Sequence, residues 1–233
     1  MKKLFLFILF FTSRFIVQSQ SVNILQYDGG FNNIESLVTN AYQNAGFEQV
    51  NFTFGNIDLT LTPENYQILI VQENDIWGPV PPNTVGNPLS DEVAELIENY
   101  VLNGGHVILC SESSETIYPN KSLIIINNIY GTNLVNGPFY VHQYGPSINR
   151  VHPSNGPGGL SVQPTIVTTG SYSTTLNVPN CNKLYTSGSQ DANYVSYSTC
   201  THTISLFPSK PTPNEGSIFF SNEANIPFLP FGG

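Results

Sequence analysis

The stretch that decides the fold runs from Leu89 to Ser113 and reads LSDEVAELIENYVLNGGHVILCSES. Its first half predicts an amphipathic helix over 90–103, because five apolar residues recur at helical spacing: Val93, Leu96, Ile97, Tyr100 and Val101. Ser90 can cap this helix, and Gly104 supplies the left-handed residue that ends it. The run HVILC that follows is typical of a strand buried on both faces, as in a parallel sheet.

The neighbouring segments extend the same pattern. A mostly parallel central sheet is predicted from four strands, at 22–27, 49–54, 67–72 and 106–110. A second helix is predicted over 33–45, ended by Gly46. The segment from Lys121 to Gly131 could be a short helix or a strand, and we favour the helix because the chain needs a connection before it returns to the sheet.

From Gly137 onward the chain is rich in proline, glycine and short strand-like runs. These runs fall at 165–169, 183–187, 194–198, 202–207 and 217–221. The fold class predicted for the whole is therefore α/β, a doubly wound, mostly parallel sheet with a β-rich C-terminal part.

The first residues are typical of a targeting segment. Lys2 and Lys3 precede the apolar run from Leu4 to Phe11, which predicts a signal peptide over 1–19 and export of the protein. That run is too short for a stable membrane span, and no later segment is apolar enough to make one. We expect a secreted, cell-surface or periplasmic domain over 20–233, and whether the natural chain continues past Gly233 is left open.

The charge of the expected mature chain argues against one class of partner. Four basic residues stand against sixteen acidic ones after residue 19, a net charge of −12. Such a surface repels phosphate backbones, so nucleic acid is not expected as a partner. Asn, Ser, Thr and Tyr are abundant, which favours a surface that binds through hydrogen bonds. Among the three cysteines, Cys181 and Cys200 could form a disulfide or remain two thiols.

Five patches, taken in order, resemble the class I glutamine amidotransferase-like superfamily, a flavodoxin-like fold that includes ThuA-like proteins. The patches are ENYQILIV (64–71), LSDEVAELIENYVLNGGHVILC (89–110), NNIYGTNL (127–134), VHPSNGPGG (151–159) and GSIFFSNEANI (216–226). The resemblance implies a flavodoxin-like sheet, and the VHPSNGPGG turn is similar to that of non-catalytic members.

Catalytic members of that superfamily carry a Gly-x-Cys-x-Gly elbow at the end of the central strand, where Cys110 falls. Ile108 and Glu112 occupy the two glycine positions, and Pro153 and Ser154 follow His152 where a His-x-Glu pair would stand. Two hypotheses follow for Cys110: a thiol nucleophile with His142 or His152 as base, or a small buried core residue. We favour the second, since nearby carboxylates oppose thiolate formation.

A candidate binding site lies at the carboxyl ends of the predicted strands. There the fold would gather four acidic residues and one aromatic: Asp28, Glu73, Asp75, Glu112 and Trp77. The acidic residues could also be ligands of Ca²⁺ or Mg²⁺, but no ligand spacing supports a metal site, and no cofactor is expected. A neutral, hydroxyl-rich ligand such as a glycan suits this rim, since no arginine lies near it in the sequence.

Three functions therefore remain open at the level of the sequence. The first is a secreted, non-enzymatic α/β domain with a binding or architectural role, inside a larger surface protein or alone. The second is a hydrolase or amidase that uses Cys110. The third is a ThuA-like module that binds or processes carbohydrate.

Overall fold

The computed structural model describes residues 21–28, 34–73, 89–111, 120–141, 147–150, 166–168, 172–176, 183–186, 203–207 and 216–221. The predicted signal peptide lies outside the described residues, and so do Cys181, Cys200 and the strand-like run at 194–198. No helix in the described ranges is long and apolar enough to cross a membrane.

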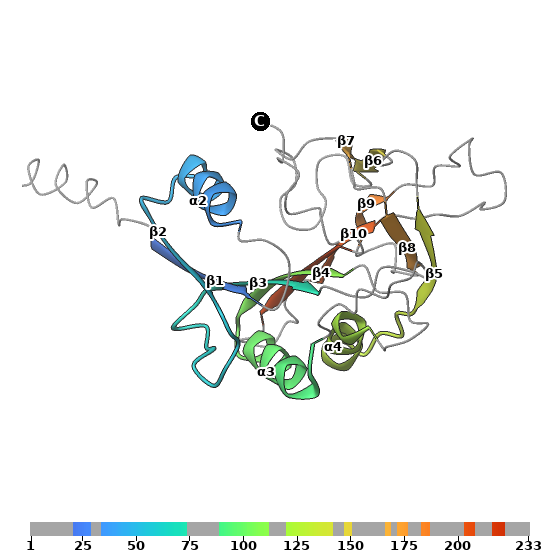
Figure 1. Cartoon of the computed structure of the whole chain (residues 1–233), viewed down its shortest axis with the longest axis horizontal. Coiled ribbons are helices and arrows are strands. Elements are labelled where there is room, and N and C mark those ends of the chain that lie inside the picture. Colours follow the sequence, from blue (N-terminus) through green and yellow to red (C-terminus); the bar gives the residue numbers. More distant parts are fainter. Residues whose placement is uncertain are drawn as a thin grey trace, which may run out of the picture.

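One large sheet organises the molecule (Figure 1). Its parallel part has the order β2-β1-β3-β4-β11. The five strands are β1 (Ser21–Tyr27), β2 (Gln49–Gly55), β3 (Ile68–Glu73), β4 (His106–Ser111) and β11 (Ser217–Ser221). β4 lies between β3 and β11 and is parallel to both, as the apolar run HVILC predicts.

Helices cover both faces of the parallel strands. Helix α2 (Glu35–Asn44) packs on one face, where Val38 joins Val22, Ile24 and Ile70 in a small apolar cluster. Helices α3 (Asp91–Leu102) and α4 (Lys121–Tyr130) pack on the other face, over a larger core (Figure 1). The fully buried Tyr100, Ile126 and Phe220 belong to that core.

The β-rich segment lies between α4 and β11 in the sequence. β6 (Ser147–Arg150), β7 (Ile166–Thr168), β9 (Lys183–Thr186) and β10 (Thr203–Phe207) extend the large sheet in antiparallel fashion beyond β11. β5 (Asn136–Val141) and β8 (Tyr172–Leu176) form a separate two-stranded sheet. The last described strand, β11, therefore returns the chain to the parallel part.

The predicted elements agree with these observations. The four predicted central strands all lie in the parallel part of the sheet, and the strand-like run predicted at 217–221 supplies the fifth, β11. Both predicted helices lie within one or two residues of their predicted ends. The ambiguous segment after Lys121 is a helix, and Gly131 ends it in the left-handed conformation. The α/β class is confirmed.

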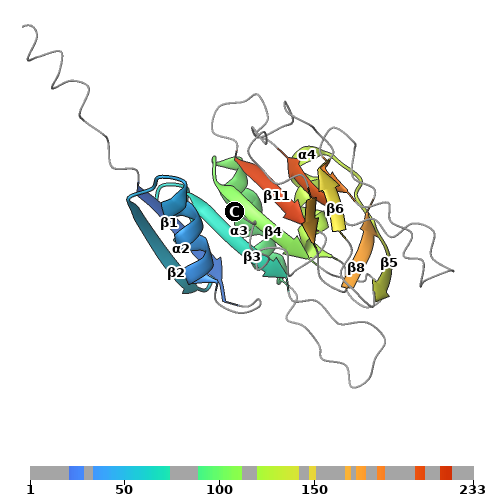
Figure 2. The ribbon, with the colours of Figure 1, turned by 90° about the horizontal axis from the view of Figure 1, so that it is seen from above.

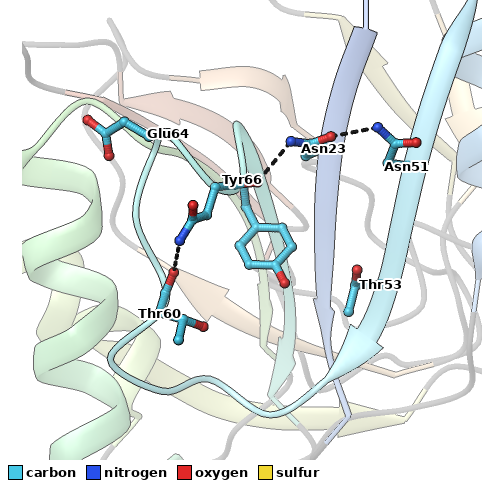
Figure 3. Close-up of a pocket in the computed structure, with 7 residues that line it drawn as sticks. Asn23, Asn51, Thr53, Thr60, Glu64 and Tyr66 are labelled. Carbon is cyan, nitrogen blue, oxygen red and sulfur yellow. Dashed lines mark hydrogen bonds between the residues drawn. The ribbon is translucent and has the colours of Figure 1, made fainter.

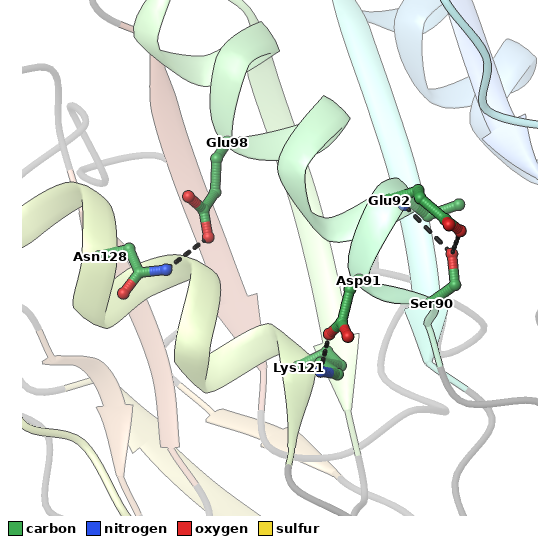
Figure 4. Close-up of polar contacts among 7 residues, drawn as sticks. Ser90, Asp91, Glu92, Glu98, Lys121 and Asn128 are labelled. Carbon is green, nitrogen blue, oxygen red and sulfur yellow. Dashed lines mark hydrogen bonds and ion pairs between the residues drawn. The ribbon is translucent and has the colours of Figure 1, made fainter.

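Helices α3 and α4 run in the same direction and are joined by side-chain contacts near each end (Figure 4). Ser90 Oγ accepts the N–H of Val93 at the start of α3, as its position predicts. Lys121 forms an ion pair with Asp91 at the first turns, and Asn128 Nδ2 donates to Glu98 Oε1 at 2.7 Å two turns later. Polar contacts at a protein surface contribute little to the free energy of folding. Their main effect here is on how the two helices are aligned.

The turn from α3 into β4 is the tightest point of the fold. Gly104 has φ +104° and closes the helix. A Cβ built on the next residue, Gly105, would lie 2.3 Å from the ring of Tyr100, which is almost fully buried. A Cβ on Gly216 would lie 1.6 Å from the carbonyl oxygen of Gly105. The backbone before β11 therefore packs directly on this turn.

We predict that Gly105→Ala lowers the free energy of unfolding by about 2–3 kcal/mol, because its methyl group overlaps the confined Tyr100 ring. The matched control is Gly55→Ala at the end of β2, where the nearest atom to a new Cβ is 4.0 Å away. That control should stay within about 0.5 kcal/mol of the parent chain. Urea denaturation of the three chains measures the difference, and equal stability of the two variants would contradict the close packing.

Candidate functional site

The predicted rim lies at the carboxyl ends of β1 and β3. Asp28 follows β1 directly, is exposed, and its N–H donates to the carbonyl of Gly55 at 3.0 Å. Glu73 is the last residue of β3, paired with Ser111 of β4. The structure thus brings Asp28 and Glu73 to the same edge of the sheet, where strand order reverses around β1. Asp75, Trp77 and Glu112 lie outside the described residues, as do His142 and His152.

A buried amide pair lies just beneath this edge. Gln26 Nε2 donates to Gln72 Oε1 at 3.1 Å, and both side chains are almost fully buried. Gln26 Oε1 in turn accepts the N–H of Ile34, the N-cap residue immediately before α2, at 3.0 Å. The pair therefore links β1, β3 and the start of α2, where the Ile34 side chain provides no cap of its own.

Cys110 lies inside the sheet. It belongs to β4, with Gln72 opposite it on β3 and Ser221 opposite it on β11. Its exposed fraction is 0%. A nucleophile must reach its substrate, so this placement favours the core interpretation of the thiol over the nucleophile hypothesis. Among the described residues, no group of three or more His, Cys, Asp or Glu side chains is placed to hold a metal ion.

The described residues also form a groove at the opposite, amino-terminal half of β1 and β2 (Figure 3). It has a volume of about 450 Å³. Seven side chains line it: Asn23, Asn51, Thr53, Thr60, Glu64, Asn65 and Tyr66. The first three come from β1 and β2, and the other four come from the connection over 56–67 that crosses β1 to reach β3.

The connection keeps its shape through local hydrogen bonds. Asp58 Oδ1 accepts the N–H and the hydroxyl of Thr60 at 2.7 and 2.6 Å. These two bonds hold the pKa of Asp58 below its usual value. Ile57 and Leu61 anchor the connection in the core, whereas Leu59 at its tip is 87% exposed. The groove wall is thus a defined turn with Thr60 presented beside the groove.

The floor of the groove is a chain of side-chain amides that crosses two strands. Gln49 Nε2 donates to Asn51 Oδ1 at 3.2 Å, and Asn51 Nδ2 donates to Asn23 Oδ1 at 2.7 Å. Asn23 Nδ2 then donates to the carbonyl of Asn65 at 3.0 Å. Asn65 Nδ2 closes the chain on the carbonyl of Thr60 at 2.8 Å. Each amide has a second N–H and a second lone pair that can serve a ligand.

Tyr66 provides the aromatic surface of the groove. Its ring lies between the connection and β1, with Thr53 across from it on β2 (Figure 3). Its carbonyl accepts the hydroxyl of Tyr100 at 2.9 Å, and the side chain packs partly on the large core. The buried Tyr100 of α3 therefore holds the groove connection against the helix.

None of the seven groove residues was expected as a site from the sequence. The signal present in the sequence was the alternation of QVNFTF, which places Gln49, Asn51 and Thr53 on one face of β2. In an alternating strand the polar residues ordinarily face solvent. The pattern therefore does not show that the connection over 56–67 lies beside the polar face of β2. Residues 60–66 come from a turn with no periodic pattern.

Comparisons with known proteins bear on the fold. No protein-family model matches the chain, and no curated protein does. Among solved structures, a catalytic mutant of Gan42B, a GH42 β-galactosidase from G. stearothermophilus, is similar over 87% of this chain and 27% of its own, at 10% identity and a TM-score of 0.50. The exo-β-1,4-mannosidase Op5Man5 from Opitutaceae bacterium strain TAV5 matches over 88% of this chain and 31% of its own, at 8% identity and a TM-score of 0.47. This chain spans less than a third of either enzyme, and the first likeness concerns fold alone.

We predict that Tyr100→Phe lowers the free energy of unfolding by about 1 kcal/mol at neutral pH, because the Tyr66 carbonyl loses its donor. Burial raises the pKa of Tyr100 well above its usual value. Above about pH 10 the unfolded chain loses this phenolic proton while the folded chain keeps it, so the parent chain loses stability as pH rises. The variant should lose less over that range, and urea denaturation at pH 8 and near pH 11 measures both slopes. Identical slopes would contradict the assignment.

We predict that Cys110 resists alkylation in the folded protein, since its side chain is fully buried. Peptide mass spectrometry after iodoacetamide treatment should find Cys110 modified only when the chain is treated in denaturant. Rapid modification in native buffer, at the rate of a small-molecule thiol, would contradict the core placement.

Proposed function

We propose that this chain is a non-enzymatic binding domain whose ligand is neutral and rich in hydroxyl groups, as a glycan is. The carrying observation is the groove beside β1 and β2, lined by three asparagines, two threonines, one tyrosine and one glutamate. Six of the seven lining residues carry an amide, a hydroxyl or a carboxylate and the seventh is a tyrosine, so the groove offers many hydrogen-bonding groups around one aromatic ring. The proposal combines the binding role of our first hypothesis with the carbohydrate ligand of the third.

The amide chain supports this ligand class because of its hydrogen-bonding capacity. A sugar hydroxyl donates and accepts at one atom, and a side-chain amide offers a donor and an acceptor a short distance apart. The side chains of Asn51 and Asn23 bond to each other, and that of Asn65 donates to the carbonyl of Thr60, so little side-chain freedom is lost when a ligand binds. The Tyr66 ring can pack against the apolar face of a sugar ring.

Charge supports the same choice. None of the seven lining residues is basic, and Glu64 is acidic. The whole chain carries a net charge of −9, so phosphate or sulfate groups gain nothing at this groove. A neutral ligand meets no such repulsion, and carboxylate and amide oxygens can accept its hydroxyl protons.

We also propose that the parallel part of the sheet is flavodoxin-like, in keeping with the superfamily resemblance. The strand order 2-1-3-4 followed by a fifth parallel strand is the order of that class, with β11 in the fifth place. The segment between α4 and β11 would then be a β-rich insertion. On this view the chain is a domain of an exported protein, and the hydrolase hypothesis for Cys110 becomes the alternative that its burial disfavours.

The predicted rim remains a second candidate site. Asp28 and Glu73 lie where doubly wound sheets place their ligands. Asp75, Trp77 and Glu112, which lie outside the described residues, remain predicted members of that site. An architectural role in a larger surface protein would need no ligand at either place. The groove is preferred because all seven residues that line it are described, whereas only Asp28 and Glu73 of the predicted rim are.

We predict that the double variant Asn51→Ala with Thr53→Val weakens glycan binding at least tenfold, about 1.4 kcal/mol or more. Both residues are exposed on β2, so the thermal midpoint should change by only a few degrees. Titration calorimetry against the best ligand from a panel of neutral polysaccharides measures the loss. The matched control is Asp28→Asn with Glu73→Gln at the rim, which should bind as the parent does.

The control also separates the two candidate sites. Loss of binding in the rim variant alone would overturn the groove in favour of the rim. If the parent chain binds no member of the panel, the glycan-binding proposal fails.

A further inference from the structure

β2 is an edge strand of the large sheet, with one side unpaired among the described residues. β2 is the first strand in the sheet order, and among the described residues only β1 pairs with it (Figure 2). None of its seven residues is buried, and the Phe54 side chain is 42% exposed. A row of backbone N–H and C=O groups therefore faces outward along this strand.

Within β2 itself, the protections that usually prevent an edge strand from pairing with another chain are missing. Edge strands are commonly blunted by lysine, proline, a bulge or short length. β2 reads QVNFTFG, with no charged residue and no proline. Its register with β1 runs unbroken over seven pairs, from Ser21 opposite Gln49 to Tyr27 opposite Gly55. A long, regular and uncharged edge is the template that a partner strand needs.

We propose that β2 pairs antiparallel with β2 of a second copy of this chain, which makes one continuous sheet across a two-fold axis. This inference does not depend on the proposed function, because it rests on the strand alone. Such a contact uses the same patch on both copies and closes on itself.

The sequence of β2 is complementary to itself in this arrangement. With the axis at Phe52, that residue meets Phe52 of the second copy, and Val50 meets Phe54 of the second copy on the same face. On the other face Asn51 meets Thr53 of the second copy. Apolar residues thus pair with apolar ones and polar with polar, which is the pairing that stabilises adjacent strands.

Electrostatic repulsion between two copies is weaker along β2 than over the rest of the surface. Two chains of net charge −9 repel one another over most of their area. β2 has no charge of its own, and in this register the adjacent Glu48 meets Asn56 of the second copy. No like charges are brought together along the paired strands, so the edge is where two copies can approach.

The contact would also set the two polar grooves side by side. Asn51 and Thr53 line the groove and lie on one face of β2, so a two-fold axis normal to the sheet joins the same face of both copies. If the proposed glycan-binding function holds, the joined groove suits an extended chain. The proposed dimer does not require that ligand.

We expect the purified chain to sediment as a dimer in analytical ultracentrifugation, with dissociation on dilution. Phe54→Lys should weaken the dimer at least about tenfold, because each copy then sets an ammonium against Val50 of the other. The matched control is Leu59→Lys, which adds the same charge at an 87% exposed site off the strand and should leave the dimer intact. A monomeric parent chain, or a Phe54→Lys variant as dimeric as the parent, would overturn the proposal.

A cross-link tests the register independently. In an antiparallel pair, directly opposite Cα atoms lie about 4.5–5.5 Å apart, which a disulfide can bridge. Phe52→Cys should therefore form an intermolecular disulfide between the two residues 52, identified by mass spectrometry, whereas Leu59→Cys should not. Equal cross-linking of the two variants would reject this pairing even where a dimer is found. Glycan binding measured on Phe54→Lys then reports on the groove separately, because Phe54 does not line it.

Discussion

The close contact between the Tyr100 ring and Gly105 at the end of α3 constrains how the neighbouring strands and the groove connection pack. Because Gly105 has no side chain, the Tyr100 ring can lie against the turn, and because Gly216 has none, the backbone before β11 can approach the carbonyl oxygen of Gly105. Val101 O accepts the N–H groups of both Gly104 and Gly216, so the helix end is tied to β4 and β11 at once. The Tyr100 hydroxyl extends the same constraint to the Tyr66 carbonyl and hence to the groove.

Two ends of the sheet carry different kinds of polar chemistry. At the carboxyl edge the buried Gln26–Gln72 pair is satisfied internally and fixes the start of α2. At the amino-terminal half of β1 and β2 the amides of Asn23 and Asn51 are also bonded to one another, but they lie at a groove open to solvent. The first arrangement stabilises the fold, and the second leaves capacity for a ligand. This difference in exposure separates a structural polar cluster from a candidate binding site.

Both the proposed ligand binding and the proposed dimer depend on how few charged residues lie on and around β2. A surface that relies on Asn, Thr and Tyr can meet neutral ligands, and it leaves β2 without the charged residues that usually guard an edge strand. The two faces of β2 then have separate roles in our proposals. The polar face lines the groove, and the apolar face with Phe54 supports pairing between copies. Both follow from a strict alternation along one strand.

The helices, the parallel strands and the α/β class could be predicted from local patterns in the amino-acid sequence. Helices and strands can be predicted from short stretches of sequence, because their repeats and end signals involve residues close together in the chain. Examples are the helical spacing from Val93 to Val101, the helix end at Gly104 and the apolar run after His106. They also placed Cys110 on the central strand. The groove, by contrast, depends on contacts between residues that are far apart in the sequence. Asn23, Asn51 and Asn65 lie up to 42 residues apart, and they meet because the 56–67 connection crosses over β1, a path set by packing of Ile57 and Leu61 in the core. No periodicity in the sequence encodes that crossing, so the groove could not be read from it.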